Sequence, residues 1–105
     1  LTLRRELAIG TGVDNINVDA TGDLWIGAHP KLLTFTAHMM GFRETAPSQV
    51  VRLKRNEGYR LEEVMLSDGT DLSGSSTAAR HGDRLLVGGV FAAGFLDCTM
   101  APAAK

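Results

Sequence analysis

Short runs in which apolar and polar residues alternate, separated by turn-forming residues, dominate this chain. Ile16 and Val18 alternate with polar neighbours, residues 19–22 read Asp-Ala-Thr-Gly, and residues 23–27 form a second run rich in apolar side chains. Alternation with a period of two is typical of a half-buried strand, and Asp and Gly between two such runs are typical of a turn. Residues 13–30 therefore predict an antiparallel hairpin.

This hairpin is expected to bring polar side chains together at its open end. Asp14 and Asn15 stand at the start of the first strand, and His29 stands at the end of the second. Because the two strands are antiparallel, these ends lie at the same edge of the sheet. The pattern thus predicts a carboxylate, an amide and an imidazole at one edge of an apolar hairpin.

The rest of the chain continues the succession of short strands and turns. Residues 1–8 fit either a strand or a short helical turn, since so few residues do not separate the two periods. Further strands are predicted at residues 32–37, 50–54, 59–66, 76–80, 84–90 and 95–100. About eight short strands at spacings of roughly 8–12 residues, without a long amphipathic helix, indicate an all-β sandwich, barrel or propeller.

A short internal repeat favours the propeller. Residues 22–27 (Gly-Asp-Leu-Trp-Ile-Gly) are echoed by residues 82–88 (Gly-Asp-Arg-Leu-Leu-Val-Gly). A repeated unit with about four strands fits one propeller blade. The fold class expected is therefore all-β, a fragment with about two four-stranded antiparallel blades. Roughly residues 9–58 form one blade, 59–100 form most of the last blade, and 101–105 form a frayed tail.

Two blades cannot close a propeller, which needs about four to eight blades to cover its sheet faces. The chain also begins with Leu rather than Met. We therefore expect it to be a piece of a longer protein, with the missing N-terminal blades as its partner.

Composition excludes some classes of partner and adds little else. The 105 residues carry 11 Lys and Arg against 12 Asp and Glu, a net charge of −1 that gives no reason to expect nucleic acid as a partner. No apolar run approaches the roughly 20 residues needed to cross a bilayer, so no membrane segment is expected in this part.

The residues alone leave the candidate chemistry open. Asp14 and Asn15 are suitable oxygen donors for a metal ion, yet Asx residues also form ordinary turns at strand ends. His29 is either a hydrogen-bonded structural histidine or a residue that lines a pocket. The single cysteine, Cys98, is either a small half-buried apolar residue or half of a disulfide with sequence outside this chain.

Other polar residues have simpler interpretations. Ser75–Thr77 lack the Gly-x-Ser-x-Gly context of a serine nucleophile, and His38 and His81 fall in predicted solvated loops. Arg52, Lys54 and Arg55 are expected to form a basic edge that discourages strand pairing. Trp25 is predicted to belong to the blade core.

Several segments resemble one family in particular. Residues 14–30, Asp-Asn-Ile-Asn-Val-Asp-Ala-Thr-Gly-Asp-Leu-Trp-Ile-Gly-Ala-His-Pro, are similar to a stretch of the serum paraoxonase/arylesterase family. The likeness continues through 47–53 (Pro-Ser-Gln-Val-Val-Arg-Leu), 68–75 and 85–91, and it ends at Cys98. It therefore covers nearly the whole chain, which looks like the C-terminal third of such a protein.

The resemblance implies a six-bladed propeller with calcium in its central tunnel and hydrolysis of aryl esters and lactones. On this basis Asp14 and Asn15 are expected to be calcium ligands. No catalytic residue is expected within this fragment, because the family's remaining ligands and water-activating histidines come from earlier blades. The fragment alone is therefore expected to be inactive.

Further roles follow from the same resemblance. The substrate pocket is expected to include His29, Ser76, Val90 and Phe91. Cys98 is expected to pair with a cysteine near the N-terminus of the whole protein, which points to a secreted or extracytoplasmic location. The alternative function is a non-catalytic propeller scaffold in which Asp14 and Asn15 form only a turn.

The chain departs from the family pattern at two places. Ala28 stands where the family has a free cysteine, a change that leaves the expected calcium ligands untouched. Residues 31–40 also depart from the pattern. In the family these positions form part of the pocket wall, so the resemblance does not predict the substrate preference of this chain.

Overall fold

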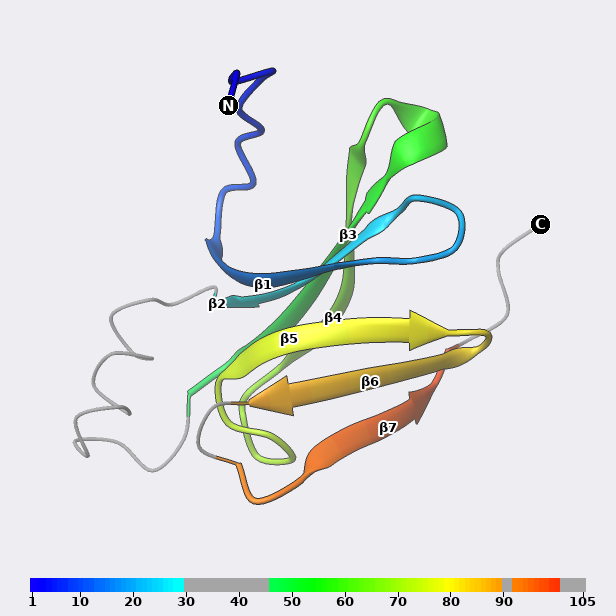
Figure 1. Cartoon of the computed structure of the whole chain (residues 1–105). Coiled ribbons are helices and arrows are strands. Elements are labelled where there is room, and N and C mark those ends of the chain that lie inside the picture. The colour runs from blue at the N-terminus through cyan, green and yellow to red at the C-terminus, as the bar shows by residue number, and fades with distance from the viewer. Residues whose placement is uncertain (30–45, 90–91, 101–105) are drawn as a thin grey trace.

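The computed structural model describes residues 1–29, 46–89 and 92–100, and there the chain forms two antiparallel sheets (Figure 1). The first sheet has the order β1-β2-β3-β4 and the second the order β5-β6-β7. The strands are β1 (Gly12–Val18), β2 (Leu24–His29), β3 (Ser48–Lys54), β4 (Arg60–Ser67), β5 (Ser75–His81), β6 (Arg84–Gly89) and β7 (Phe95–Thr99). This architecture confirms the all-β propeller-fragment class that the sequence predicts.

Both predicted hairpins are present. β1 and β2 pair on either side of the turn at 19–22, and β5 and β6 pair on either side of the turn at 82–83. The two copies of the internal repeat thus fall on β2 and β6, each the second strand of its sheet. The strand predicted at 32–37 lies outside the described residues.

The sheets divide later in the chain than the predicted blade boundary at 58–59. β4 pairs with β3 along its length and completes the first sheet. The turn at 55–58 closes this β3–β4 hairpin, with Gly58 in the left-handed region at φ 67°. A turn signal of this kind marks a reversal of the chain and does not tell whether the next strand joins the same sheet.

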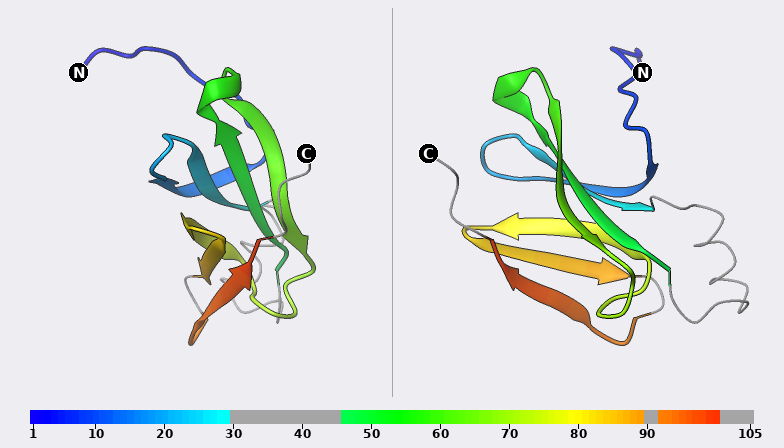
Figure 2. Two further views of the ribbon diagram at one scale, coloured as in Figure 1. Left: turned by 90° about the vertical axis from the view of Figure 1, so that its right-hand side faces the viewer. Right: turned by 180° about the vertical axis from the view of Figure 1, so that it is seen from behind.

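A hydrophobic core lies between the two sheets. Figure 2 shows the arrangement of the two sheets from two further directions. Trp25 of β2 is fully buried and packs there with Val50 of β3, as the sequence predicts for Trp25. The second sheet and its preceding link complete this cluster with Leu72, Ala78, Leu85 and Val87. Burial of this large aromatic ring, together with the aliphatic side chains around it, stabilises the contact between the sheets.

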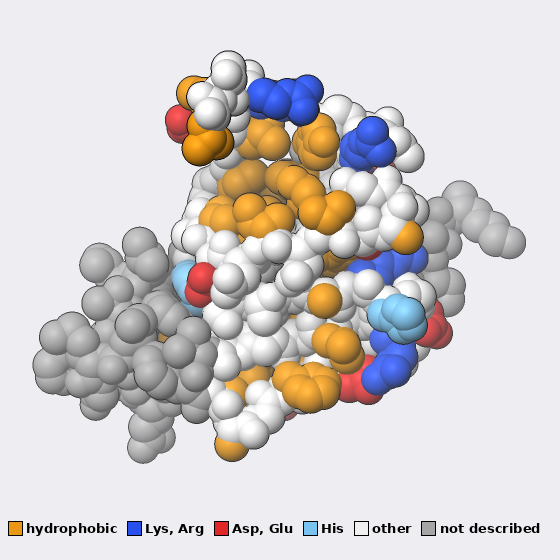
Figure 3. Space-filling model, viewed as in Figure 1, with side chains coloured by type: hydrophobic (Ala, Val, Ile, Leu, Met, Phe, Trp, Pro, Cys, Tyr) orange, Lys and Arg blue, Asp and Glu red, His pale blue; other side chains and the backbone are white. Residues whose placement is uncertain are grey.

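The opposite face of the first sheet is only partly covered. We call it the outer face, and its apolar residues are Ile16, Val18, Leu24, Ile26, Val51, Leu53 and Leu61. Hydrophobic side chains gather over the upper part of the first sheet in Figure 3. Ile16 and Val18, predicted to be half-buried, are 53% and 65% exposed. The prediction is wrong for these two side chains, because β5 contacts β1 from the opposite face and no described residue forms a second layer over the outer face of β1.

The predicted basic edge is also wrong. β3 is an inner strand of its sheet, so Arg52 is not at an edge. Its guanidinium pairs with the carboxylate of Asp23 and lies 5.0 Å from the centre of the Trp25 ring. Lys54 is 3.2 Å from the carboxylate of Glu57. Both side chains thus form ion pairs with residues in or beside the turns of the first sheet.

Two smaller points complete the fold. Residues 1–8 form neither the strand nor the helical turn that their pattern left open. Among the described residues there is no helix of the length and apolar character that a membrane span requires.

Candidate metal centre

Asp14 and Asn15 lie at an irregularity in β1. Val13 pairs with Ala28 and Ile16 pairs with Ile26, so two residues of β1 stand opposite Gly27 alone. An extra residue on one strand is a β-bulge, which bends the strand and redirects its side chains. Bulges are frequent beside functional sites. The bulge therefore puts Asp14 and Asn15 together opposite Gly27, near the open end of the β1–β2 hairpin.

The carboxylate of Asp14 lies beside the imidazole of His29. Asp14 Oδ2 is 3.4 Å from His29 Nε2. The His29 side chain is 6% exposed, whereas that of Asp14 is 36% exposed, so the histidine forms the buried side of this contact. The predicted meeting of the two strand ends is confirmed, because Gly12 of β1 pairs directly with His29 of β2.

Asn15 is tied to the second sheet. Its Nδ2 donates a hydrogen bond to the main-chain oxygen of Ser76 on β5, at 3.2 Å. Ser76 is itself buried, and its hydroxyl lies 3.4 Å from the main-chain oxygen of Gly88. Among the predicted site residues, the structure thus pairs Asp14 with His29 and the Asn15 side chain with the main chain of Ser76. Val90 and Phe91 lie outside the described residues.

The donor set at the bulge suits a hard cation such as calcium but is incomplete. Asp14 supplies carboxylate oxygens, and the Oδ1 of Asn15 is not used in its hydrogen bond to Ser76. Calcium binds about six to eight oxygen ligands, typically carboxylate and carbonyl oxygens. Within residues 1–29, 46–89 and 92–100 no group of three or more His, Cys, Asp or Glu side chains is arranged to hold a metal ion. These residues fit part of a calcium site.

Cys98 lies away from this end of β1. It is half-buried on β7 and carries a free thiol in this chain. It lines a cleft of about 310 Å³ between the outer strands of the two sheets, together with Met65 of β4 and Leu85 of β6. The thiol is therefore reachable from that cleft.

A second polar cluster occupies the opposite end of β1, where the sequence predicts only a turn. The Trp25 indole donates to Asp19 Oδ2 at 2.9 Å, and Thr21 donates to Asp19 Oδ1 through both its amide and its hydroxyl. Burial raises the pKa of the Asp19 carboxyl, but these hydrogen bonds lower it more and bring it to about 2. Asp19 is thus held in its charged form.

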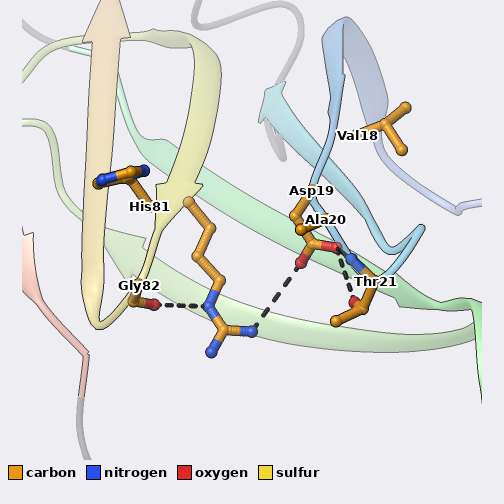
Figure 4. A pocket seen from close by; sticks show the side chains of 7 residues that line it. Val18, Asp19, Ala20, Thr21, His81 and Gly82 are labelled. Atoms are coloured by element: carbon orange, nitrogen blue, oxygen red, sulfur yellow. Dashed lines mark hydrogen bonds and ion pairs between the residues drawn. The ribbon is translucent and has the colours of Figure 1, made fainter.

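Arg80 joins this cluster from β5 and lines a cleft of about 350 Å³ with Asp19 and His81 (Figure 4). Its guanidinium is 3.9 Å from Asp19 and also donates to the main-chain oxygen of Gly82 at 2.8 Å. The positive Arg80 and the negative Asp19 face each other. The cluster therefore connects the turn at 19–22 with the turn at 82–83. In the sequence, this cluster could have been found from Asp19, which opens the turn and stands six residues before Trp25.

Comparison with known proteins gives a consistent match. A family model described as Arylesterase matches residues 1–100. Serum paraoxonase/arylesterase 1 of Homo sapiens is 38% identical over 95 residues, which cover 87% of this chain and 26% of that protein. Serum paraoxonase/lactonase 3 of Homo sapiens is 35% identical and serum paraoxonase/arylesterase 2 of Rattus norvegicus 33% identical, both over 97 residues with the same coverage. The chain spans about a quarter of the length of these relatives.

Proposed function

The chain belongs to the arylesterase family, as its sequence resemblance predicts, and from this premise we propose that it is part of a calcium-dependent hydrolase of aryl esters and lactones. The names of the relatives describe arylesterases, paraoxonases and lactonases. Since the chain spans about a quarter of their length, the activity belongs to the complete protein. The 105-residue chain alone is expected to be inactive.

The observation that carries this proposal is the bulge at Asp14 and Asn15. It carries a carboxylate and an amide on consecutive residues of the edge strand, and the carboxylate lies 3.4 Å from the imidazole of His29. These are oxygen donors of the kind that calcium takes. The remaining donors would come from the missing N-terminal blades, which are the expected partner of this chain.

The residues of this chain would bind the calcium ion and orient its ligands. Asp14 and Asn15 would hold the ion, and the buried ring of His29 would fix the direction of the Asp14 carboxylate. Calcium, when bound, would polarise the carbonyl of the ester or lactone and stabilise the negative charge that develops on its oxygen. His29, Ser76, Val90 and Phe91 are proposed to line the substrate pocket.

The outer face supports the view that further blades pack on this chain. Ile16 and Val18 expose large apolar side chains next to the partly covered Leu24. The core between the two sheets shows how a neighbouring sheet buries such residues. Preceding blades of the same protein would cover the outer face in the same manner.

Cys98 is proposed to form a disulfide with a cysteine in the N-terminal part of the complete protein. Its half-burial at a cleft between the outer strands leaves room for a further segment there. Such a disulfide requires an oxidising compartment, and the relatives are named serum proteins. We therefore propose that the protein is secreted.

The proposal is tested by the variants Asp14→Ala and Asn15→Ala in the complete protein. Both should lower calcium affinity and the rate of hydrolysis of an aryl ester and a lactone, since each removes an oxygen donor. Calcium affinity is measured by titration calorimetry and hydrolysis by product absorbance. Unchanged affinity and unchanged hydrolysis in both variants would favour the alternative, a propeller used as a binding scaffold.

A further inference from the structure

Strands β2 and β5 approach each other more closely at Gly27 than any side chain would allow. A Cβ atom built on Gly27 would lie 2.3 Å from both the carbonyl carbon of Ser76 and the amide nitrogen of Thr77. It would lie 2.7 Å from the main-chain oxygen of Ser76. These separations are far below van der Waals contact, so the two backbones meet only because residue 27 is glycine.

The same approach brings the backbone of β5 within reach of the amides on β1. Asn15, in the bulge opposite Gly27, donates to the Ser76 oxygen at 3.2 Å. Asn17 donates through its Nδ2 to the hydroxyl of Thr77 and to the main-chain oxygen of Ala78, both at 2.9 Å. Two asparagines two positions apart are therefore held against β5 by their NH₂ groups.

The hydrogen bond to Ser76 determines which end of the Asn15 amide faces away from β5. A main-chain carbonyl is only an acceptor, so the atom that faces it must be the NH₂ nitrogen. The Oδ1 of Asn15 is then directed away from Ser76. A metal ligand must present its oxygen, and outer contacts that orient ligands commonly change metal affinity about 10–100-fold.

We propose that Gly27 and the main-chain carbonyl of Ser76 are positioning groups that present the Oδ1 of Asn15 to calcium. This inference rests on the proposed function, in which Asn15 is a ligand. It adds that the ligand works only as an amide, because a side chain with two oxygens cannot donate to Ser76. It also assigns to Gly27 a role through the distance between β2 and β5.

The test compares Asn15→Asp and Asn15→Ala in the complete protein, with calcium affinity measured by titration calorimetry. Asp keeps an oxygen in place of the Asn15 Oδ1, replaces the NH₂ group by a second oxygen and adds a negative charge. A ligand that needs no positioning would therefore bind calcium equally or more tightly as Asp. With positioning, Asn15→Asp places a carboxylate oxygen against the Ser76 oxygen and should weaken calcium binding at least about tenfold. Affinity in Asn15→Asp equal to or above that of the parent would overturn the positioning role.

The Asn15→Ala variant separates this proposal from the one on which it rests. Weaker binding in Asn15→Ala together with parent-like binding in Asn15→Asp retains the calcium site and rejects the positioning by Ser76. Parent-like calcium binding in Asn15→Ala rejects Asn15 as a ligand, and the positioning proposal fails with it.

Gly27→Ala tests the same positioning of Asn15 through the distance between β2 and β5. The added methyl group should push β5 away from β2, lengthen the contact between Asn15 and Ser76, and weaken calcium binding at least about tenfold. Gly94→Ala is the matched control, because a Cβ atom there meets nothing within 4 Å. Parent-like calcium affinity in a folded Gly27→Ala protein would contradict the proposal. If that variant does not fold, the Asn15→Asp comparison still decides.

Discussion

Ile16 of β1 and Ile26 of β2 are directly paired across the sheet, yet Ile16 is 53% exposed and Ile26 only 2%. Paired residues share one face of a sheet, so the two isoleucines belong to the same apolar surface. Ile26 is covered by its neighbours Val51 and Leu53, whereas Ile16 projects from the edge strand. The outer face is thus covered at β2 and β3 and leaves its apolar side chains exposed at β1.

This relationship predicts opposite effects of one double variant in two contexts. The double variant Ile16→Thr, Val18→Thr removes exposed apolar surface. In the 105-residue chain it should therefore reduce self-association and the binding of a fluorescent dye that recognises apolar surfaces. In the complete protein the same change should lower the free energy of unfolding by about 1–3 kcal/mol. Dye fluorescence, sedimentation and chemical denaturation measure these effects. Equal stability of the complete protein with and without the change would show that no blade covers the outer face.

The charged state of Asp19 predicts a loss of stability in acid. Its folded pKa of about 2 lies below the ordinary value of 3.8, so its stabilising effect is full above about pH 4 and is lost as the pH falls toward 2. A difference of this size corresponds to about 2 kcal/mol. Asp19→Asn should therefore lower the free energy of unfolding at pH 7 and flatten its dependence on pH between 4 and 2.

Thr21→Ala provides the graded comparison for this prediction. It removes one hydrogen bond to the Asp19 carboxylate, at 2.7 Å, and leaves that of the Trp25 indole in place. The pKa of Asp19 should rise part of the way toward its ordinary value, and the acid transition should move to higher pH. Denaturation curves collected from pH 2 to 7 test both variants. An unaltered pH dependence in Asp19→Asn would refute the role assigned to this carboxylate.

Two neighbouring serines predict unequal costs of substitution. The Ser75 hydroxyl is buried between the sheets. It accepts a hydrogen bond from the main-chain N–H of Gln49 at 2.9 Å and lies 3.1 Å from the main-chain oxygen of Ala28. Ser75→Ala leaves that buried amide without this acceptor and should cost about 1–3 kcal/mol of unfolding free energy. Ser76→Ala removes only a long contact of 3.4 Å and should cost less. Equal losses in the two variants would argue against Ser75 as the link between sheets.

Two glycines in left-handed conformations separate strain from steric conflict. Gly69 has φ 96°, and a Cβ atom there would lie 2.1 Å from the oxygen of Ala46. Gly82 has φ 63° with nothing within 4 Å of such an atom. Gly82→Ala should cost about 1–2 kcal/mol from backbone strain alone, and Gly69→Ala should cost clearly more. Thermal melting of both variants measures these losses of stability. A larger loss in Gly82→Ala than in Gly69→Ala would contradict the prediction.

The local pattern of this chain was sufficient for the seven strands that the structure describes, for the hairpins β1–β2 and β5–β6, and for the meeting of Asp14 with His29. Each depends on residues near in sequence: apolar alternation sets the faces of a strand, and a short turn sets which ends meet. The family motif around residues 14–30 likewise lies within one hairpin. A sequence read by itself therefore predicts the hairpin and the resemblance it carries.

Tertiary structure decided what these local patterns leave open. The turn at 55–58 did not reveal that β4 stays in the first sheet, because sheet membership depends on pairing over the whole strand. Alternation at Ile16 and Val18 marked an apolar face without showing what covers it. The approach of β5 to Gly27, and with it the direction of the Asn15 amide, depends on a contact between residues about 60 positions apart. No periodicity within one segment records that contact, since it depends on how two sheets pack.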